Sequence, residues 1–207
     1  GMITVTNPAG ITGTLAEVNT TLASAGISDN IGAADKVIVT DSMTVTEALA
    51  LDGTAAIVEA TISNGNLTGT NALDDLAETT NKYTITVTDT VANAVALNTV
   101  NDATIGLVTV TSSSISGAQT AVATALGKPS TEIAGLDAIN VTLTDTERTV
   151  AQVNTIEGLT TGTITHTGTI SDNDMTTLIP EIIKYCFILS LKKNERIEKK
   201  ININEIK

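Results

Sequence analysis

Aromatic side chains are nearly missing from this 207-residue chain: Trp is absent, and the class is represented only by Tyr83, Tyr185 and Phe187. The hydrophobic fraction is nevertheless 42%, a normal value for a folded protein. The core must therefore be built from Ala, Val, Leu and Ile. The excess lies in Thr, which supplies roughly a fifth of the residues, several times its ordinary share.

Cysteine and histidine are each present once, as Cys186 and His166. A single cysteine excludes an intrachain disulfide framework and a Cys-based zinc site, and a single histidine excludes a two-His metal motif. His166 has no Ser or Cys nucleophile in a recognisable context. We expect no catalytic residue, no metal and no cofactor, and hence no enzyme.

Basic residues are scarce, with 11 Lys and Arg against 23 Asp and Glu, for a net charge of −12. Binding to the phosphate backbone of nucleic acid requires the opposite sign. An anionic membrane surface is disfavoured for the same reason. We expect no nucleic-acid partner.

Long apolar runs and targeting signals are also missing. The longest apolar stretch lies within 179–191 and is interrupted by Pro180, Glu181 and Lys184, well short of the ~20 residues that span a bilayer. The N-terminus has no basic region followed by an apolar one, so we expect no signal peptide in this sequence. We expect no membrane insertion.

A pattern of strand, polar residue and helix recurs seven times along residues 1–180. Apolar residues and Thr alternate with period 2 in the strand segments, which is typical of a strand with one buried face. Each strand ends in a polar residue: Asn7, Asp41, Asn64, Asp89, Ser113, Asp145 and Asp172. The strand segments are 3–6, 37–40, 57–63, 83–88, 107–111, 139–144 and 163–170.

Helical segments rich in Ala and Leu follow the strands, with apolar residues at a spacing of three or four. They are 15–22, 45–51, 72–77, 91–97, 118–126, 150–156 and 175–179. A strand of ~5 residues and a helix of ~10 residues both span ~15–17 Å, so each pair can fold back on itself.

The sequence therefore predicts an α/β repeat fold, a right-handed βα solenoid with a parallel sheet. Each unit of about 25 residues holds one short strand and one short helix. An all-β parallel β-helix is the alternative, because helices of two to three turns are marginal on their own.

Two predictions concern burial in the strands. Because the period is 2, Ile85, Val87, Val108, Val110, Val141 and Leu143 should face the helices. The intervening threonines should face outward as an exposed Thr face, consisting of Thr84, Thr86, Thr88, Thr109, Thr111, Thr142 and Thr144.

The Asp residues after the strands are predicted helix N-caps, whose carboxylates accept backbone N–H bonds and complement the helix dipole. These are Asp41, Asp89, Asp145 and Asp172. A row of calcium sites is the alternative. However, 172–183 lacks the Gly and Glu that an EF-hand loop requires at its sixth and twelfth positions.

Segments 39–51, 87–97 and 143–153 share the pattern Val/Leu-Thr-Asp followed by Val and Ala, and in the first two segments also by Leu. They resemble the "VTDT…VAxAxAL" repeats of very long, Thr/Ala/Asp-rich proteins of marine bacteria and cyanobacteria. The resemblance covers most of residues 1–180. It implies a fragment of a large, adhesin-like surface or secreted protein, whose partners are the neighbouring repeats of its own parent chain.

The last 27 residues depart from the repeats: 181–207 contain no Thr, Gly, Ala or Val but seven of the 11 Lys and Arg. Two explanations stay open. The segment is either a cap that covers the last unit, since solenoid ends expose apolar surface, or an out-of-frame remnant that promotes self-association through its Ile and Leu residues.

These observations predict a non-catalytic structural repeat of an extracellular or cell-surface protein. The competing hypothesis is a ligand-binding module that presents the exposed Thr face to ice or to a glycan.

Overall fold

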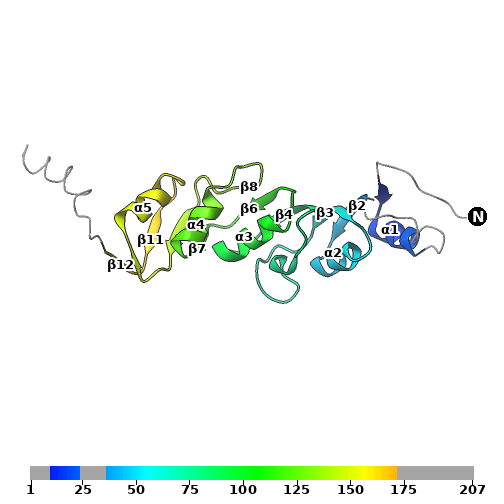
Figure 1. The fold of residues 1–207 in the computed structure, drawn as a ribbon, viewed down its shortest axis with the longest axis horizontal. Helices are drawn as coiled ribbons and strands as arrows, with labels where there is room; N and C mark the ends of the chain where they lie inside the picture. Colours follow the sequence, from blue (N-terminus) through cyan, green and yellow to red (C-terminus); the bar gives the residue numbers. More distant parts are fainter. Residues whose placement is uncertain (1–9, 24–35, 172–207) are drawn as a thin grey trace, which may run out of the picture. The chain divides into compact units, whose positions relative to one another are not determined.

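The computed structural model describes residues 10–23 and 36–171, and within these ranges the protein is an α/β structure with parallel sheets and five α-helices (Figure 1). The prediction of an α/β fold is confirmed, and the helices argue against the all-β alternative. Among the predicted features, strand 3–6, helix 175–179, the cap Asp172 and the segment 181–207 lie outside the described residues.

Six units follow one another along the described chain, each running from a strand to a helix or helical turn. In chain order the elements are β1 (Ile11–Gly13) and α1 (Leu15–Leu22); β2 (Lys36–Met43) and α2 (Val45–Asp52); β3 (Ile57–Ile62) and the 3-10 turn η1 (Leu73–Asp75); β4 (Lys82–Val87), β5 (Val91–Asn93) and α3 (Ala94–Asp102); β6 (Val108–Val110), β7 (Ser114–Gly117) and α4 (Gln119–Leu126); β8 (Ile133–Ala134), β9 (Asn140–Leu143), β10 (Glu147–Arg148) and α5 (Val150–Glu157). We call these units 1 to 6. They are followed by β11 (Ile164–His166) and β12 (Thr169–Ile170).

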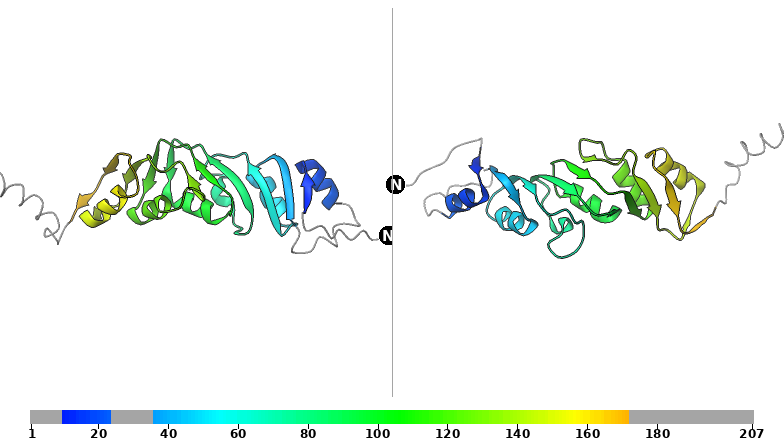
Figure 2. Two further views of the ribbon diagram at one scale, coloured as in Figure 1. Left: turned by 90° about the horizontal axis from the view of Figure 1, so that it is seen from above. Right: turned by 180° about the vertical axis from the view of Figure 1, so that it is seen from behind.

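The strands of consecutive units pair in parallel, as the sequence predicts. One sheet has the order β1-β2-β3-β4-β6-β8, and a second has the order β11-β9-β7-β5. Figure 2 shows β2, β3 and β4 lying side by side, in agreement with their parallel pairing. Helices α3 and α4 contact the strands of the second sheet and also contact each other.

Units 4 to 6 contain more than one strand before the helix, which the prediction of one strand per unit did not include. Segment 91–97 was expected to be helical throughout, yet Val91–Asn93 forms β5. The helix begins only at Ala94 because the Asn93 side chain accepts hydrogen bonds from the N–H groups of Val95 and Ala96. The chain therefore turns from the first sheet into the second between β4 and β5.

Unit 3 lacks an α-helix. The predicted helix 72–77 is present only as the three-residue turn η1. The segment before it holds Gly69 with φ of 123° and Asn71 with φ of 54°, left-handed conformations that interrupt a right-handed helix. Its apolar side chains are still buried, because Leu67, Leu73 and Leu76 are at most 2% exposed.

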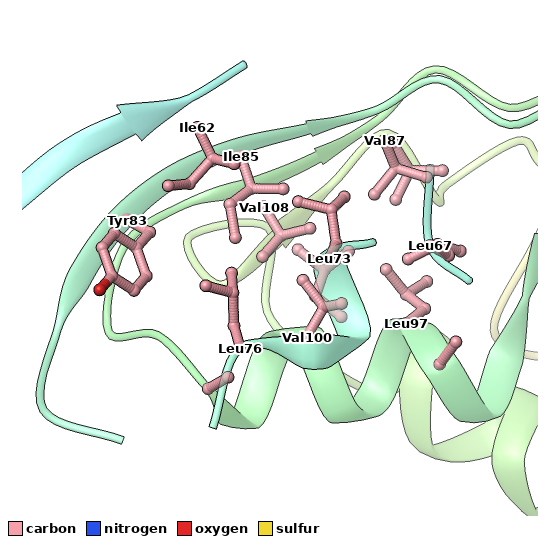
Figure 3. Packing of buried hydrophobic residues seen from close by; sticks show 14 of the residues in the cluster. Ile62, Leu67, Leu73, Leu76, Tyr83, Ile85, Val87, Leu97, Val100 and Val108 are labelled. Carbon is pink, nitrogen blue, oxygen red and sulfur yellow. The ribbon is translucent and has the colours of Figure 1, made fainter. Parts of the chain in front are cut away.

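The hydrophobic core lies between the strands and the helices (Figure 3). Ile85 and Val108 from the strands point toward Leu97 and Val100 of α3, and Leu73 of unit 3 packs beside them. The predicted alternation in the strands is confirmed. The six residues expected to face the helices, Ile85, Val87, Val108, Val110, Val141 and Leu143, are all at most 4% exposed.

Two glycines stand at strand entries where neighbouring backbones approach closely. A Cβ on Gly106 would lie 2.1 Å from the carbonyl oxygen of Tyr83, and one on Gly162 would lie 2.0 Å from that of Ile139. Real Cβ atoms do not come this close, so these positions require glycine.

Candidate functional surfaces

The residues at the N-cap positions of the helices are not the predicted ones. The N-caps with side-chain hydrogen bonds are Thr14 for α1, Thr44 for α2, Asn93 for α3 and Thr149 for α5. Ala118 precedes α4 without a side-chain cap bond. The assignment of Asp41, Asp89 and Asp145 as N-caps of the helices that follow them is therefore wrong. Each lies three or four residues before the true N-cap position, too early to cap its own helix.

Asp41 and Asp145 instead bind the helix of the preceding unit. Asp41 Oδ1 accepts the N–H of Leu15, the first residue of α1, at 2.8 Å. Asp145 Oδ2 accepts the N–H of Gln119, the first residue of α4, at 2.7 Å. Strand register explains both bonds, because the pairing Gly13↔Val39 places Leu15 level with Asp41, and Gly117↔Leu143 places Gln119 level with Asp145.

Unit 3 contributes and receives the same type of contact. Asn64 Oδ1 accepts the N–H of Val45, the first residue of α2, at 3.0 Å. Asp89 Oδ2 accepts the N–H of Leu67 at 2.7 Å, in the segment where unit 3 has no helix. Asn64 was not among the predicted caps, although it belongs to the polar residues that end the predicted strands. A polar residue at the end of a predicted strand is therefore the sequence signal that Asn64 shares with Asp41, Asp89 and Asp145.

A second set of side chains bridges units where the strands begin. The Asn81 side chain is buried: it accepts the N–H of Val58 at 2.7 Å and donates to Asp52 Oδ1 at 2.6 Å. The hydroxyl of Thr104 accepts the N–H of Tyr83 at 2.7 Å, again from the next unit. Buried backbone donors need such partners. No sequence pattern marked Asn81 or Thr104 for this role.

Helices α1 and α2 each begin with a capping box. Glu17 accepts the backbone N–H of Thr14 at 2.9 Å, and Glu47 accepts that of Thr44 at 2.7 Å. These backbone bonds, followed by bonds from the Thr hydroxyls, hold the pKa of both carboxyl groups below the ordinary value of 4.5. In α5 Gln152 takes the same position and accepts the N–H of Thr149 at 2.8 Å.

A small ionic cluster lies on the outer side of β2, β3 and β4. Glu59 pairs with Lys36, and its other oxygen lies 2.8 Å from Lys82 Nζ. The bonds from Lys36 and then Lys82 hold the pKa of Glu59 below its ordinary value. Burial, in contrast, raises the pKa of the Tyr83 phenol above its ordinary range. Both features are consistent with structural roles.

The predicted Thr face is accessible but not continuous. Thr109 and Thr142 are half-buried, and the other five threonines, Thr84, Thr86, Thr88, Thr111 and Thr144, are exposed. The set divides between two sheets, since β4 and β6 belong to the first and β9 to the second.

The register interrupts the Thr face further. Thr86 pairs with Thr109, but the next residue in that row is Ala134. In the neighbouring row of paired positions, Lys82 lies opposite Glu59, so that row contains a charged pair instead of threonines. The hydroxyl of Thr111 is engaged with the carbonyl of Val87 at 2.7 Å. The regular Thr ladder of the ice-binding hypothesis is therefore reduced to short segments.

Arg148 is buried at an inward-facing strand position and is only 2% exposed. Its Nη2 donates to the backbone carbonyls of Leu143 and Asp145, while Nε and Nη1 are buried without a hydrogen-bond partner. Ala92 holds the corresponding position in unit 4, two residues before the first residue of the helix. Buried cations with unpaired donors are costly.

A hollow of about 500 Å³ between α1 and α2 is lined by Asn19, Leu22, Glu47, Leu51 and Thr54, among others. No group of three or more His, Cys, Asp and Glu in the described ranges is placed to hold a metal ion.

His166 is exposed on β11, with Nδ1 3.2 Å from the Gly168 carbonyl oxygen. None of the helices in residues 10–23 and 36–171 has both the length and the hydropathy to cross a membrane.

Comparison with known proteins finds no matching family model, no matching curated protein and no matching solved structure.

Proposed function

We propose that the chain is a non-catalytic structural repeat array, a right-handed βα solenoid that acts as a spacer in a large bacterial surface or secreted protein. The observation that carries this proposal is the chain of contacts between consecutive units. Parallel pairing links each strand to the next unit, and polar side chains after the strands bind the preceding unit at Leu15, Val45, Leu67 and Gln119.

The handedness follows from the parallel pairing. Parallel strands in one sheet that are joined through a helix form a right-handed crossover in nearly all cases. Each unit then contacts mainly its neighbours, so stability is close to a sum of unit and interface contributions. Such an architecture spans distance without a central site.

Charge and polar chemistry support a structural role. Lys36, Lys82 and Lys128 form ion pairs with neighbouring acidic residues. The proposed location outside the cell and the likeness to Thr/Ala/Asp-rich repeats rest on the sequence pattern of residues 39–51, 87–97 and 143–153.

Single-molecule stretching of the full chain tests the spacer role. A repeat array should unfold in successive steps, each releasing about 80 Å for a unit of about 25 residues at full extension. A single step that includes the whole described region contradicts independent units. Repeating the pull on the Leu97→Ala variant should lower the force of one step and leave the others in place.

Thermal hysteresis and glycan-array binding test the competing ligand-binding function. A structural array gives neither. A positive result that is lost in a Thr86→Val, Thr109→Val double variant, with unchanged melting temperature, favours the Thr face instead. Val retains the β-branched shape but removes both hydroxyls.

A further inference from the structure

We infer that the units are coupled directionally: at α1, α2 and α4 a polar residue of the following unit, Asp41, Asn64 or Asp145, stabilises the first turn of the helix and sets the strand register between the two units. This inference rests on the proposed repeat array and specifies how neighbouring units recognise each other. The partner of each unit is the following unit, recognised by an Asp or Asn oxygen in register with the first residue of the helix.

The same geometry occurs at three helices. Two residues separate the paired strand positions Gly13↔Val39 from Leu15 and Asp41. The pairing Met43↔Ile62 likewise places Val45 level with Asn64. The pairing Gly117↔Leu143 places Gln119 level with Asp145. In all three, the acceptor comes from the later unit.

Physical chemistry gives the contact its strength and selectivity. The first N–H groups of a helix have no partner within the helix, and its N-terminus attracts negative charge. Slipping the strand by one residue moves every side chain to the opposite face. A slipped Asp145 therefore loses the Gln119 N–H, so the bond favours one register.

Helix α3 lacks this contact, and the strand register explains why. The pairing Asn93↔Ser116 makes Gly117 level with Ala94. Gly117 has no side chain to accept this N–H, and a Cβ there would lie 2.9 Å from the Ala94 Cβ. This helix instead depends on its own Asn93, which binds the N–H groups of Val95 and Ala96. Coupling through the capping bond is absent at this boundary.

Hydrogen exchange measured by NMR on the full chain tests the direction of coupling. Asp145→Ala should accelerate exchange of the Gln119 amide about tenfold, the loss expected for a hydrogen bond to a charged group, and leave the first turn of α5 unchanged. The matched variant Thr149→Ala should accelerate exchange in the first turn of α5 and leave Gln119 unchanged.

Further variants keep the test decisive. Asp145→Asn should restore most of the protection of Gln119, because Asn64 performs this role at Val45. Asp41→Ala and Thr44→Ala repeat the pair at α1 and α2. If Asp145→Ala exposes α5 rather than α4, or both equally, directional coupling is wrong, while stepwise unfolding under force can still support the spacer role.

Discussion

Units 3 and 4 are neighbours in the first sheet, yet only unit 4 has an α-helix. Unit 4 buries Leu97 and Val100 from α3, and unit 3 buries Leu67, Leu73 and Leu76 from a loop with one 3-10 turn. Both supply an apolar layer to the same core (Figure 3). A unit therefore needs buried apolar side chains and hydrogen-bonded backbone groups. A regular helix supplies both in unit 4, and a loop supplies both in unit 3.

The two units also differ in which groups hydrogen-bond to their backbone N–H groups. The helix of unit 4 begins with its own cap, Asn93. The loop of unit 3 is held by Asp89 from the next unit and by backbone bonds from Leu73 and Asp74 to Asn66 and Leu67. The loop of unit 3 therefore depends on the following unit, as α1, α2 and α4 do, whereas α3 depends on its own cap.

The largest expected effect is the loss of stability when a buried Leu is truncated in the loop of unit 3 or in helix α3. The two losses show whether the loop stabilises the core as much as the helix does. Leu73→Ala and Leu97→Ala remove side chains that are both 0% exposed. Each should lower the free energy of unfolding by about 2–5 kcal/mol, measured by urea denaturation. A cost for Leu73→Ala well below that for Leu97→Ala would show that the loop of unit 3 packs loosely.

Unit 6 has Arg148 at the inward strand position where unit 4 has Ala92. The variant Arg148→Met tests how much the buried guanidinium costs unit 6. Replacing the buried guanidinium with an apolar side chain should raise the free energy of unfolding by about 1–4 kcal/mol, because Nε and Nη1 lack partners. Met is appropriate because Met43 is fully buried in β2. Urea denaturation measures the change, and a loss of stability would show that the Nη2 bonds to the carbonyls of Leu143 and Asp145 outweigh the cost of the unpaired Nε and Nη1.

Asp89→Ala tests which unit depends on this carboxylate. We expect a loss of about 1–2 kcal/mol, with faster hydrogen exchange at Leu67 and no change in α3. Asn93→Ala should cost about 1 kcal/mol and affect α3 alone. Melting temperatures of both variants should be unchanged by a chelator, and a chelator-dependent melt would indicate a metal at Asp89 instead.

The smallest expected effect is on the pH dependence of stability. It concerns α1 and α2, whose capping boxes contain a Glu, and not α3, which has no capping box. Because the folded pKa values of Glu17 and Glu47 lie below 4.5, the unfolded state binds more protons as the pH falls. Their stabilisation is present above pH 4.5 and is lost as the pH falls through the folded pKa.

The double variant Glu17→Gln, Glu47→Gln should flatten the fall of the urea midpoint as the pH is lowered through and below 4.5, where the two carboxyl groups take up protons. Gln keeps the capping bond, as Gln152 does in α5, but does not titrate. An unchanged slope would assign the acid sensitivity to other carboxyl groups, and Glu59 is the first to test, since its pKa is also lowered.

Alternation with period 2 and helical spacing were visible in the sequence because they depend on residues close together in the chain. They located α1 at Leu15–Leu22 and the buried faces of β4, β6 and β9. The same local patterns predicted a helix at 72–77, where the left-handed Gly69 and Asn71 and the packing of Leu73 produce a loop instead.

The α/β class and the inward apolar face could be read from local periodicity, and the parallel sheet from the alternation of strands and helices along the chain. Folding in three dimensions was needed to bring Asp41 and Asp145 to the preceding helices and to place β9 in a different sheet from β6. Neighbouring strands lie about 4.8 Å apart, so a side chain in register reaches the adjacent unit more easily than its own helix four residues later. Which segments become neighbours is a non-local choice, made by packing rather than by sequence spacing.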